Sequence, residues 1–164
     1  MTAPRVSISI QTDDFDASAE LTRLRVGDAR VGAVCCFVGT VRDCHPDQKE
    51  AEVRWLELEH YPGMTERAIA AMADQAQRRF ALHGVRVIHR IGRLAPQDQI
   101  VLVAVTATHR GVAFQGCEFL MDYLKTQAPF WKKETTPSGA RWVDARAADD
   151  AALARWGIQG RNAA

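Results

Sequence analysis

In residues 124–134 of this chain, Lys125 precedes Pro129 and Lys132 follows it. Pro129 has no backbone N–H and disfavours helical geometry at the residue before it, so the sequence predicts that a helix ends at residue 126 or 127 and that an extended segment follows. Lys125 would then close the helix, and Lys132 would lie on a strand. Ammonium groups on two different elements can converge on one ligand, and that ligand would be an anion.

Further cationic side chains follow two apolar segments. Residues 32–38 are continuously apolar, which predicts a strand buried on both faces, and Arg42 comes just after its end. Residues 100–105 predict a central strand. We expect a cationic pocket that combines Arg42, His109, Arg110, Lys125, Lys132 and Lys133 with walls from Phe37, Phe130 and Trp131. Arginine grips phosphate or carboxylate through a planar fork, whereas a desolvated lysine has a lowered pKa and becomes a nucleophile.

Each of these side chains also has a structural alternative. Asp122 comes three residues before Lys125, and Glu118 comes one turn earlier, so Lys125 could be one end of an exposed ion pair. His109 could be a core histidine bound to a backbone carbonyl. Lys133 and Glu134 could be surface charges on an edge strand, and we interpret His89 and Arg90 as structural residues at a strand end.

Composition excludes several classes of protein. The 164 residues suit one domain, residues 1–164, with a frayed end at about 160–164, and the formal net charge of +1 provides no field for binding nucleic acid or an acidic membrane. No apolar segment has the length of a signal peptide or a membrane span, so we expect a cytoplasmic protein. The four cysteines show no C-x-x-C spacing, which favours small buried side chains and no metal site. Glycine-rich phosphate loops and the G-x-S-x-G motif do not occur.

The apolar periodicity predicts an α+β fold with packed helices and a mixed or mostly antiparallel sheet, because hairpin-like pairs alternate with single helices. Polar residues 44–52 predict a mobile loop. Strands are predicted at 6–10, 32–38, 53–59, 85–90, 100–105, 130–134 and 141–144, and helices after the cap Asp14, from 64 to a stop at Gly84, at 112–125 and at 149–156.

With these residues in view, the chain resembles the large, catalytic subunit of molybdopterin synthase. The resemblance runs through most of the chain, and its specificity comes from the order and separation of its segments. These are residues 37–43, 56–64, 89–92, His109-Arg110 with Ala113-Phe114, and 122–125 through 129–134. Two positions depart from the family pattern: loop 44–52 lacks a glycine often present there, and Gln97 stands where glycine is common.

The resemblance implies a sulfurtransferase with an α/β hammerhead fold. That family converts cyclic pyranopterin monophosphate, or precursor Z, to molybdopterin by installing two dithiolene sulfurs, a step of molybdenum cofactor biosynthesis. The sulfur arrives on a small ubiquitin-like subunit whose C-terminal Gly-Gly ends in a thiocarboxylate. The large subunits form a central homodimer with one small subunit at each end, a heterotetramer, and bind no permanent cofactor.

The resemblance also implies roles for individual residues. Lys125 would attack or activate the thiocarboxylate carbonyl, and Lys132 would assist at the substrate. Substrate binding is implied for Thr40, Val41, Arg42, His109, Arg110, Lys133 and Glu134, with His109 or Arg110 open to being supplied by the second subunit, and pocket lining for Phe37 and Met121. A water-poor cationic pocket suits two anionic ligands and an oxyanion at the attacked carbonyl.

Two other functions remain open on the sequence. A lysine enzyme could form a Schiff base with a phosphorylated carbonyl compound and need no protein partner. Alternatively, Arg42, Lys132, Lys133 and the nearby aromatic side chains could clamp single-stranded RNA, although the near-zero net charge disfavours this.

Overall fold

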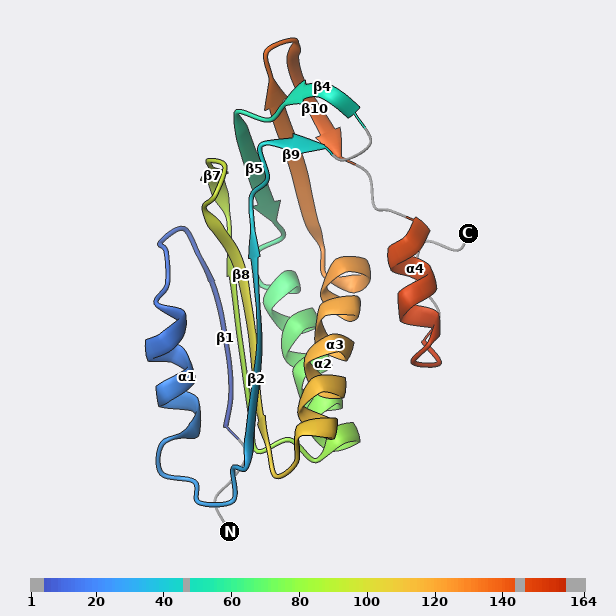
Figure 1. The fold of residues 1–164 in the computed structure, drawn as a ribbon. Coiled ribbons are helices and arrows are strands. Elements are labelled where there is room, and N and C mark those ends of the chain that lie inside the picture. Colours follow the sequence, from blue (N-terminus) through green and yellow to red (C-terminus); the bar gives the residue numbers. More distant parts are fainter. Residues whose placement is uncertain (1–4, 46–47, 144–146, 159–164) are drawn as a thin grey trace.

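The computed structural model describes residues 5–45, 48–143 and 147–158, so the predicted frayed end at 160–164 lies outside the described residues. One sheet has the order β1 (Arg5–Gln11), β6 (Gly84–Arg90), β8 (Gln99–Ala107) and β2 (Ala33–Thr40). Only the β1–β6 pair is parallel. Helix α1 (Ala17–Arg25) covers one face, and α2 (Met64–Phe80) and α3 (Arg110–Gln127) cover the other (Figure 1). The predicted α+β class and the central position of β8 are confirmed.

A second sheet extends one end of the first (Figure 1). Its order is β10 (Gly139–Val143), β9 (Phe130–Thr136), β5 (Trp55–His60) and β7 (Gly92–Leu94), and all its pairs are antiparallel. Strands β3 (Cys44–His45) and β4 (Gln48–Glu52) form a small hairpin, and α4 (Ala147–Ala154) packs beside α3. No helix among the described residues is long and apolar enough to cross a membrane.

The main core lies between the first sheet and the pair α2 and α3. Helix α2 buries Ile69, Met72, Ala76 and Phe80, which recur at helical spacing, and α3 buries Cys117 and Leu124 against the same cluster. Glu66 accepts a hydrogen bond from the backbone of Gly63 and so caps the start of α2. The apolar periodicity therefore predicts both helices correctly, and with them the face on which the sheet packs.

Four local predictions are wrong. Strand β2 is an edge strand with Val34 38% and Phe37 40% exposed, because only β8 pairs with it in the described chain. The predicted mobile loop contains the β3–β4 hairpin. Asp16, two residues after the predicted cap Asp14, accepts the capping hydrogen bond of α1. Helix α2 ends at Phe80, and its C-cap Ala81 has the left-handed conformation, so Gly84 does not end the helix.

Candidate functional site

The break at Pro129 places the two lysines as predicted. Helix α3 ends at Gln127, and Ala128 is extended with φ −78° and ψ 129°, as expected before proline. The buried Thr65 hydroxyl donates a hydrogen bond of 3.0 Å to the carbonyl of Pro129 and so anchors the connection to α2. Lys125 consequently lies in the last turn of α3, and Lys132 lies on β9.

Arg42 reaches the same end of the first sheet as these lysines. Strand β2 is antiparallel to β8, so Thr40 lies opposite Gln99 at the start of β8. Backbone hydrogen bonds then fix the next residue, from Val41 N to the Asp98 carbonyl at 2.9 Å and from Gln97 N to the Val41 carbonyl at 2.8 Å. Helix α3 returns along the sheet toward this end (Figure 1). The fold thus brings Lys125, Lys132 and the segment that contains Arg42 to the same end of the first sheet.

The predicted pocket-lining residues lie along the contact between β2 and α3. The thiols of Cys35 on β2 and Cys117 on α3 contact each other. Strand β2 and helix α3 run in the same direction (Figure 1). From this contact, two residues along the strand to Phe37 and four residues along the helix to Met121 each advance about 6 Å, so Phe37 lies level with Met121. Phe37 is 40% exposed and Met121 is partly buried. Val41 is buried, and its N–H and carbonyl already bond Asp98 and Gln97, so it can offer a ligand only the second lone pair of its carbonyl.

His109 and Arg110 lie at the opposite end of α3. His109 is the N-cap and Arg110 is the first helical residue, and both are exposed. Fifteen helical steps separate Arg110 from Lys125, which amounts to about 22 Å. Within one chain, these two residues therefore do not converge with Lys125.

Lys132 and Lys133 point to opposite faces of the second sheet. Lys132 is paired with Leu58 of β5, and Lys133 is paired with Glu57, and neighbouring residues of a strand alternate between faces. The ammonium of Lys133 lies 5.8 Å from the ring centre of Trp142. Glu134 shares the face of Lys132 and forms an ion pair of 3.3 Å with Arg141. The predicted pocket that combines all the cations therefore does not form within one chain.

A buried histidine beneath β9 is a feature that the sequence did not reveal. The His89 imidazole stacks on Phe130 with ring centres 3.8 Å apart, and its Nδ1 donates to the carbonyl of Arg90 at 2.8 Å, since a carbonyl can only accept. Burial lowers the pKa of His89 to about 4, and the charges of Lys132 and His60 add to the shift. His89 is structural, as predicted, but its partner is the first residue of β9, 41 residues away, and strand periodicity carries no signal for that contact.

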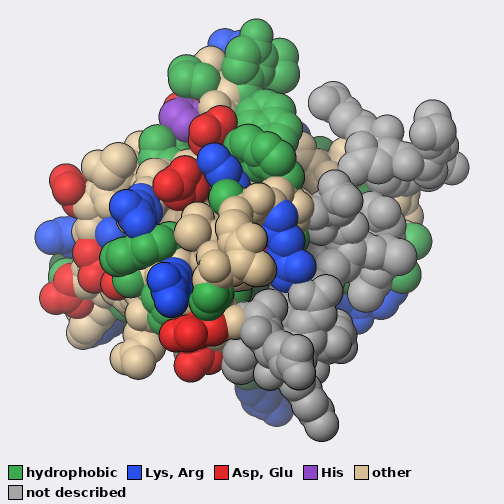
Figure 2. All heavy atoms as spheres, turned by 90° about the horizontal axis from the view of Figure 1, so that it is seen from above, with side chains coloured by type: hydrophobic (Ala, Val, Ile, Leu, Met, Phe, Trp, Pro, Cys, Tyr) green, Lys and Arg blue, Asp and Glu red, His purple; other side chains and the backbone are tan. Residues whose placement is uncertain are grey.

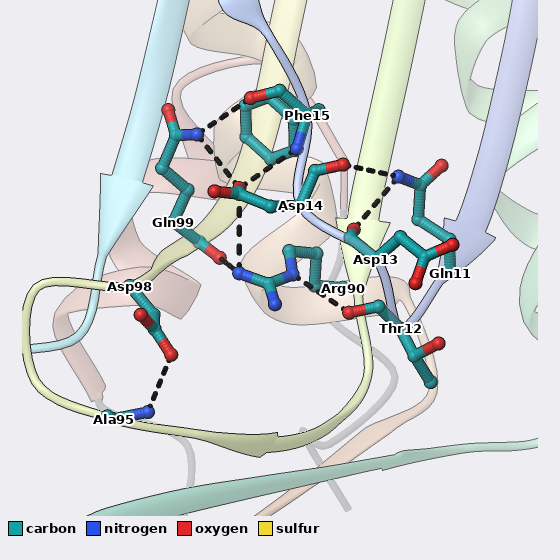
Figure 3. Close-up of polar contacts among 9 residues, drawn as sticks. All are labelled: Gln11, Thr12, Asp13, Asp14, Phe15, Arg90, Ala95, Asp98 and Gln99. Atoms are coloured by element: carbon teal, nitrogen blue, oxygen red, sulfur yellow. Dashed lines mark hydrogen bonds and ion pairs between the residues drawn. The ribbon is translucent and has the colours of Figure 1, made fainter.

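A polar network joins the ends of β1 and β6 to the start of β8, where Gln99 is paired with Thr40 (Figure 3). Arg90 donates to the carbonyls of Gln99 at 3.0 Å and Thr12 at 3.1 Å. The Gln99 amide donates to Asp14 at 2.9 Å and to the carbonyl of Phe15 at 2.8 Å. The hydrogen bond from Gln99 is the main cause that lowers the pKa of Asp14. Asp14 thus holds the start of β8, which explains why it does not cap α1.

Figure 2 shows the end of the molecule that carries the second sheet. Basic, acidic and hydrophobic side chains are interspersed there, without one continuous basic surface in the described part of this view. Such a mixture does not suit sequence-independent binding of a nucleic-acid backbone. A hollow of about 240 Å³ lies at the other end of the first sheet, beside Arg25, Asp28 and residues 31–34, and contains none of the predicted site residues. The described residues include no group of three or more potential metal-binding side chains.

Comparisons with known proteins show the family of the chain. Residues 10–127 match the family model described as MoaE protein. The molybdopterin synthase catalytic subunit of Ralstonia nicotianae is 57% identical over 157 residues, which cover 96% of this chain and 88% of that protein. The solved molybdopterin biosynthesis MoaE protein of Burkholderia ambifaria is 58% identical, with a TM-score of 0.79 and coverage of 96% of this chain and 100% of that one.

A more distant solved structure shares the fold at 18% identity. It is a complex of subunits 1 and 2 of the molybdopterin-converting factor from Helicobacter pylori, with a TM-score of 0.68, and the match covers 85% of this chain and 91% of that one. The fold is therefore kept where most of the sequence has changed. The family model spans well over half of the chain, and the relatives match it nearly end to end. This chain belongs to the MoaE family, the family of molybdopterin synthase catalytic subunits.

Proposed function

We propose that this chain inserts sulfur into cyclic pyranopterin monophosphate to make the dithiolene of molybdopterin. Family membership supports a sulfurtransferase of molybdenum cofactor biosynthesis. The observation that carries the assignment of the site is the Pro129 break, which places Lys125 on a helix and Lys132 on a strand at the same end of the first sheet as the Arg42 segment.

The two lysines have different tasks in this proposal. Lys125 attacks or activates the carbonyl of the thiocarboxylate, and Lys132 assists at the substrate. Lys125 is exposed and forms no ion pair or hydrogen bond with another described residue, so its amine is open to a ligand. Cations held in a fixed arrangement stabilise an oxyanion without reorganising during the reaction. Substrate and sulfur donor supply the reacting groups, so we propose no permanently bound cofactor.

The sulfur donor in this proposal is a small ubiquitin-like subunit with a C-terminal Gly-Gly thiocarboxylate. The complex of two subunits from Helicobacter pylori, which shares this fold, supports such an assembly. Two large subunits and two small subunits would form a heterotetramer, and the cytoplasm is the compartment that we propose for it.

A homodimer would complete the substrate site. His109 and Arg110 lie about 22 Å from Lys125 along α3, so these cations can meet it only if a second copy supplies them. Among the described strands, none pairs with the outer edge of β2, and the side chains of Val34 and Phe37 are exposed. Thr40, Arg42 and Glu134, together with the backbone of Val41, would then contact the substrate beside Lys132 and the lining residues Phe37 and Met121. Lys133 would contribute from the opposite face of the second sheet.

The test is reconstitution from purified components. The chain is incubated with cyclic pyranopterin monophosphate and the thiocarboxylated small subunit, and the dithiolene product is measured. We expect product with the unmodified chain and with Arg78→Ala, an exposed control on α2, and none with Lys125→Ala of unchanged circular dichroism. Failure of the intact chain to form product would contradict the proposal. Borohydride trapping of a substrate adduct without any partner would support the Schiff-base alternative instead.

A further inference from the structure

Two acidic side chains precede Lys125 on α3. Asp122 is three residues before Lys125, and side chains at this spacing are neighbours on a helix surface and form ion pairs when their charges are opposite. Glu118 lies one turn before Asp122. An ion pair with Asp122 would hold the Lys125 amine in its protonated form and direct it along the helix, away from an incoming carbonyl.

The segment that follows α4 binds both carboxylates. The Arg155 guanidinium lies 3.0 Å from the Glu118 carboxylate and 3.0 Å from Oδ2 of Asp122, and the Trp156 indole N–H donates to the same Oδ2 at 2.7 Å. The Asp122 side chain is 16% exposed, whereas Arg155 and Glu118 are each more than half exposed. Exposed ion pairs contribute little, so the short bond from Trp156 to the largely buried carboxylate is the stronger constraint.

Packing against α2 and α3 holds Trp156 independently of Lys125. The indole lies edge-on to Phe119 at 5.5 Å and to Phe80 at 5.8 Å. Arg79 donates to the Trp156 carbonyl at 2.8 Å, and its guanidinium lies 5.6 Å from the indole centre. The indole N–H is therefore presented to Asp122 by the hydrophobic core and needs no ligand at the lysine.

We propose that Trp156 and Arg155 are positioning residues that keep Asp122 from pairing with Lys125. The Asp122 carboxylate accepts from donors in the segment that follows α4, and the Lys125 amine therefore stays available to the thiocarboxylate. This inference rests on the proposed role of Lys125 and goes beyond it, because it assigns a task in sulfur transfer to residues that contact neither ligand.

The test is a set of variants in the reconstituted complex. Trp156→Phe with Arg155→Gln retains the aromatic packing and removes both donors to Asp122. We expect kcat for dithiolene formation to fall about three- to tenfold, and the basic limb of the pH–rate profile to move to higher pH, because an ion pair raises the pKa of a lysine. Adding Asp122→Asn should restore kcat and the profile, and Asp122→Asn alone should leave kcat within about twofold.

Rescue separates positioning from stability. The paired variant should have a lower midpoint of thermal unfolding than the unmodified chain, because two donors are lost. Asp122→Asn does not replace those donors, so it should restore kcat and leave the midpoint low. No rescue by Asp122→Asn, or a kcat unaffected by the paired change, would overturn the inference. Should the paired variant fail to fold, Arg155→Gln with and without Asp122→Asn should show a smaller change of the same sign, because Trp156 still binds Asp122. If the intact chain forms no product, the proposed function is wrong; if Lys125→Ala remains active, the proposed role of Lys125 is wrong; if Lys125→Ala is inactive while the rescue fails, only this inference is lost.

Discussion

At the scale of single residues, the first consequence concerns the buried imidazole of His89. Its Nδ1–H bond to the Arg90 carbonyl and its stacking on Phe130 place a neutral ring under the first residue of β9. Protonation would put a charge into a site that is 7% exposed and that already faces Lys132 and His60. The neutral ring therefore supports the strand that carries Lys132.

The pH dependence of stability follows from this ring. The pKa of His89 is about 4 in the folded chain and 6.5 in its ordinary state, so between these values the unfolded chain binds the extra proton. The contribution of neutral His89 to the free energy of unfolding is complete above pH 6.5. It falls by about 3 kcal/mol at most as the pH falls toward 4. Urea unfolding at pH 7, 5.5 and 4 should show a smaller decline for His89→Gln than for the unmodified chain. Equal declines would contradict this account.

Two buried threonines should respond oppositely to the same substitution. The Thr106 hydroxyl is buried on β8 without a hydrogen-bond partner among the described residues, so Thr106→Val should stabilise the chain by about 1 kcal/mol. The Thr65 hydroxyl accepts from Tyr61 N and donates to Pro129, so Thr65→Val should destabilise it by about 1–3 kcal/mol. The free energies of unfolding from urea titrations decide the sign of each change.

At the scale of elements, local chemistry and non-local pairing explain what sequence could and could not predict. Pro129 acts on its immediate neighbours, so the end of α3 was predictable to within one or two residues. The apolar run of β2 gives no sign that only one neighbour pairs with it, and the prediction of two buried faces failed there. Strand alternation alone, however, could have shown that Lys132 and Lys133 point apart. Helix length could likewise have shown that Arg110 and Lys125 are distant.

The turn before β8 gives a prediction at this scale. Gln97 has φ of 76°, and its N–H donates a hydrogen bond to the Val41 carbonyl. A side chain is strained in this left-handed region, so Gln97→Gly should stabilise the chain by about 0.5–1 kcal/mol and keep the hydrogen bond. Thermal unfolding measures the gain. A lower midpoint would show that the glutamine side chain itself contributes more than the strain costs.

At the scale of the whole molecule, the proposed dimer accounts for cations at opposite ends of one helix. One chain presents Lys125 and Lys132 at one end and His109 and Arg110 at the other. A two-fold axis that brings the ends of two chains together would make two identical sites, each built from both chains. Sites shared in this way can be tested by mixing inactive subunits.

Complementation should restore activity. Lys125→Ala and Arg110→Ala subunits should each be inactive as homodimers, whereas a mixed dimer contains one intact site and one doubly altered site. Random exchange makes half of the dimers mixed, so the mixture should recover about a quarter of the unmodified activity. Mixing Lys125→Ala with Lys132→Ala is the control and should recover none, because both lysines come from the same chain. Sedimentation checks that the dimers form.

The open edge of β2 also has a practical use. Of the three cysteines whose side chains the structure describes, Cys36 is exposed there, so the predicted burial is wrong for it, while Cys35 and Cys117 are shielded and burial raises the pKa of both thiols. A maleimide fluorophore should therefore attach to Cys36 in preference to these two. Its emission would then report, in real time and without engineering the chain, whether that strand becomes covered when subunits associate.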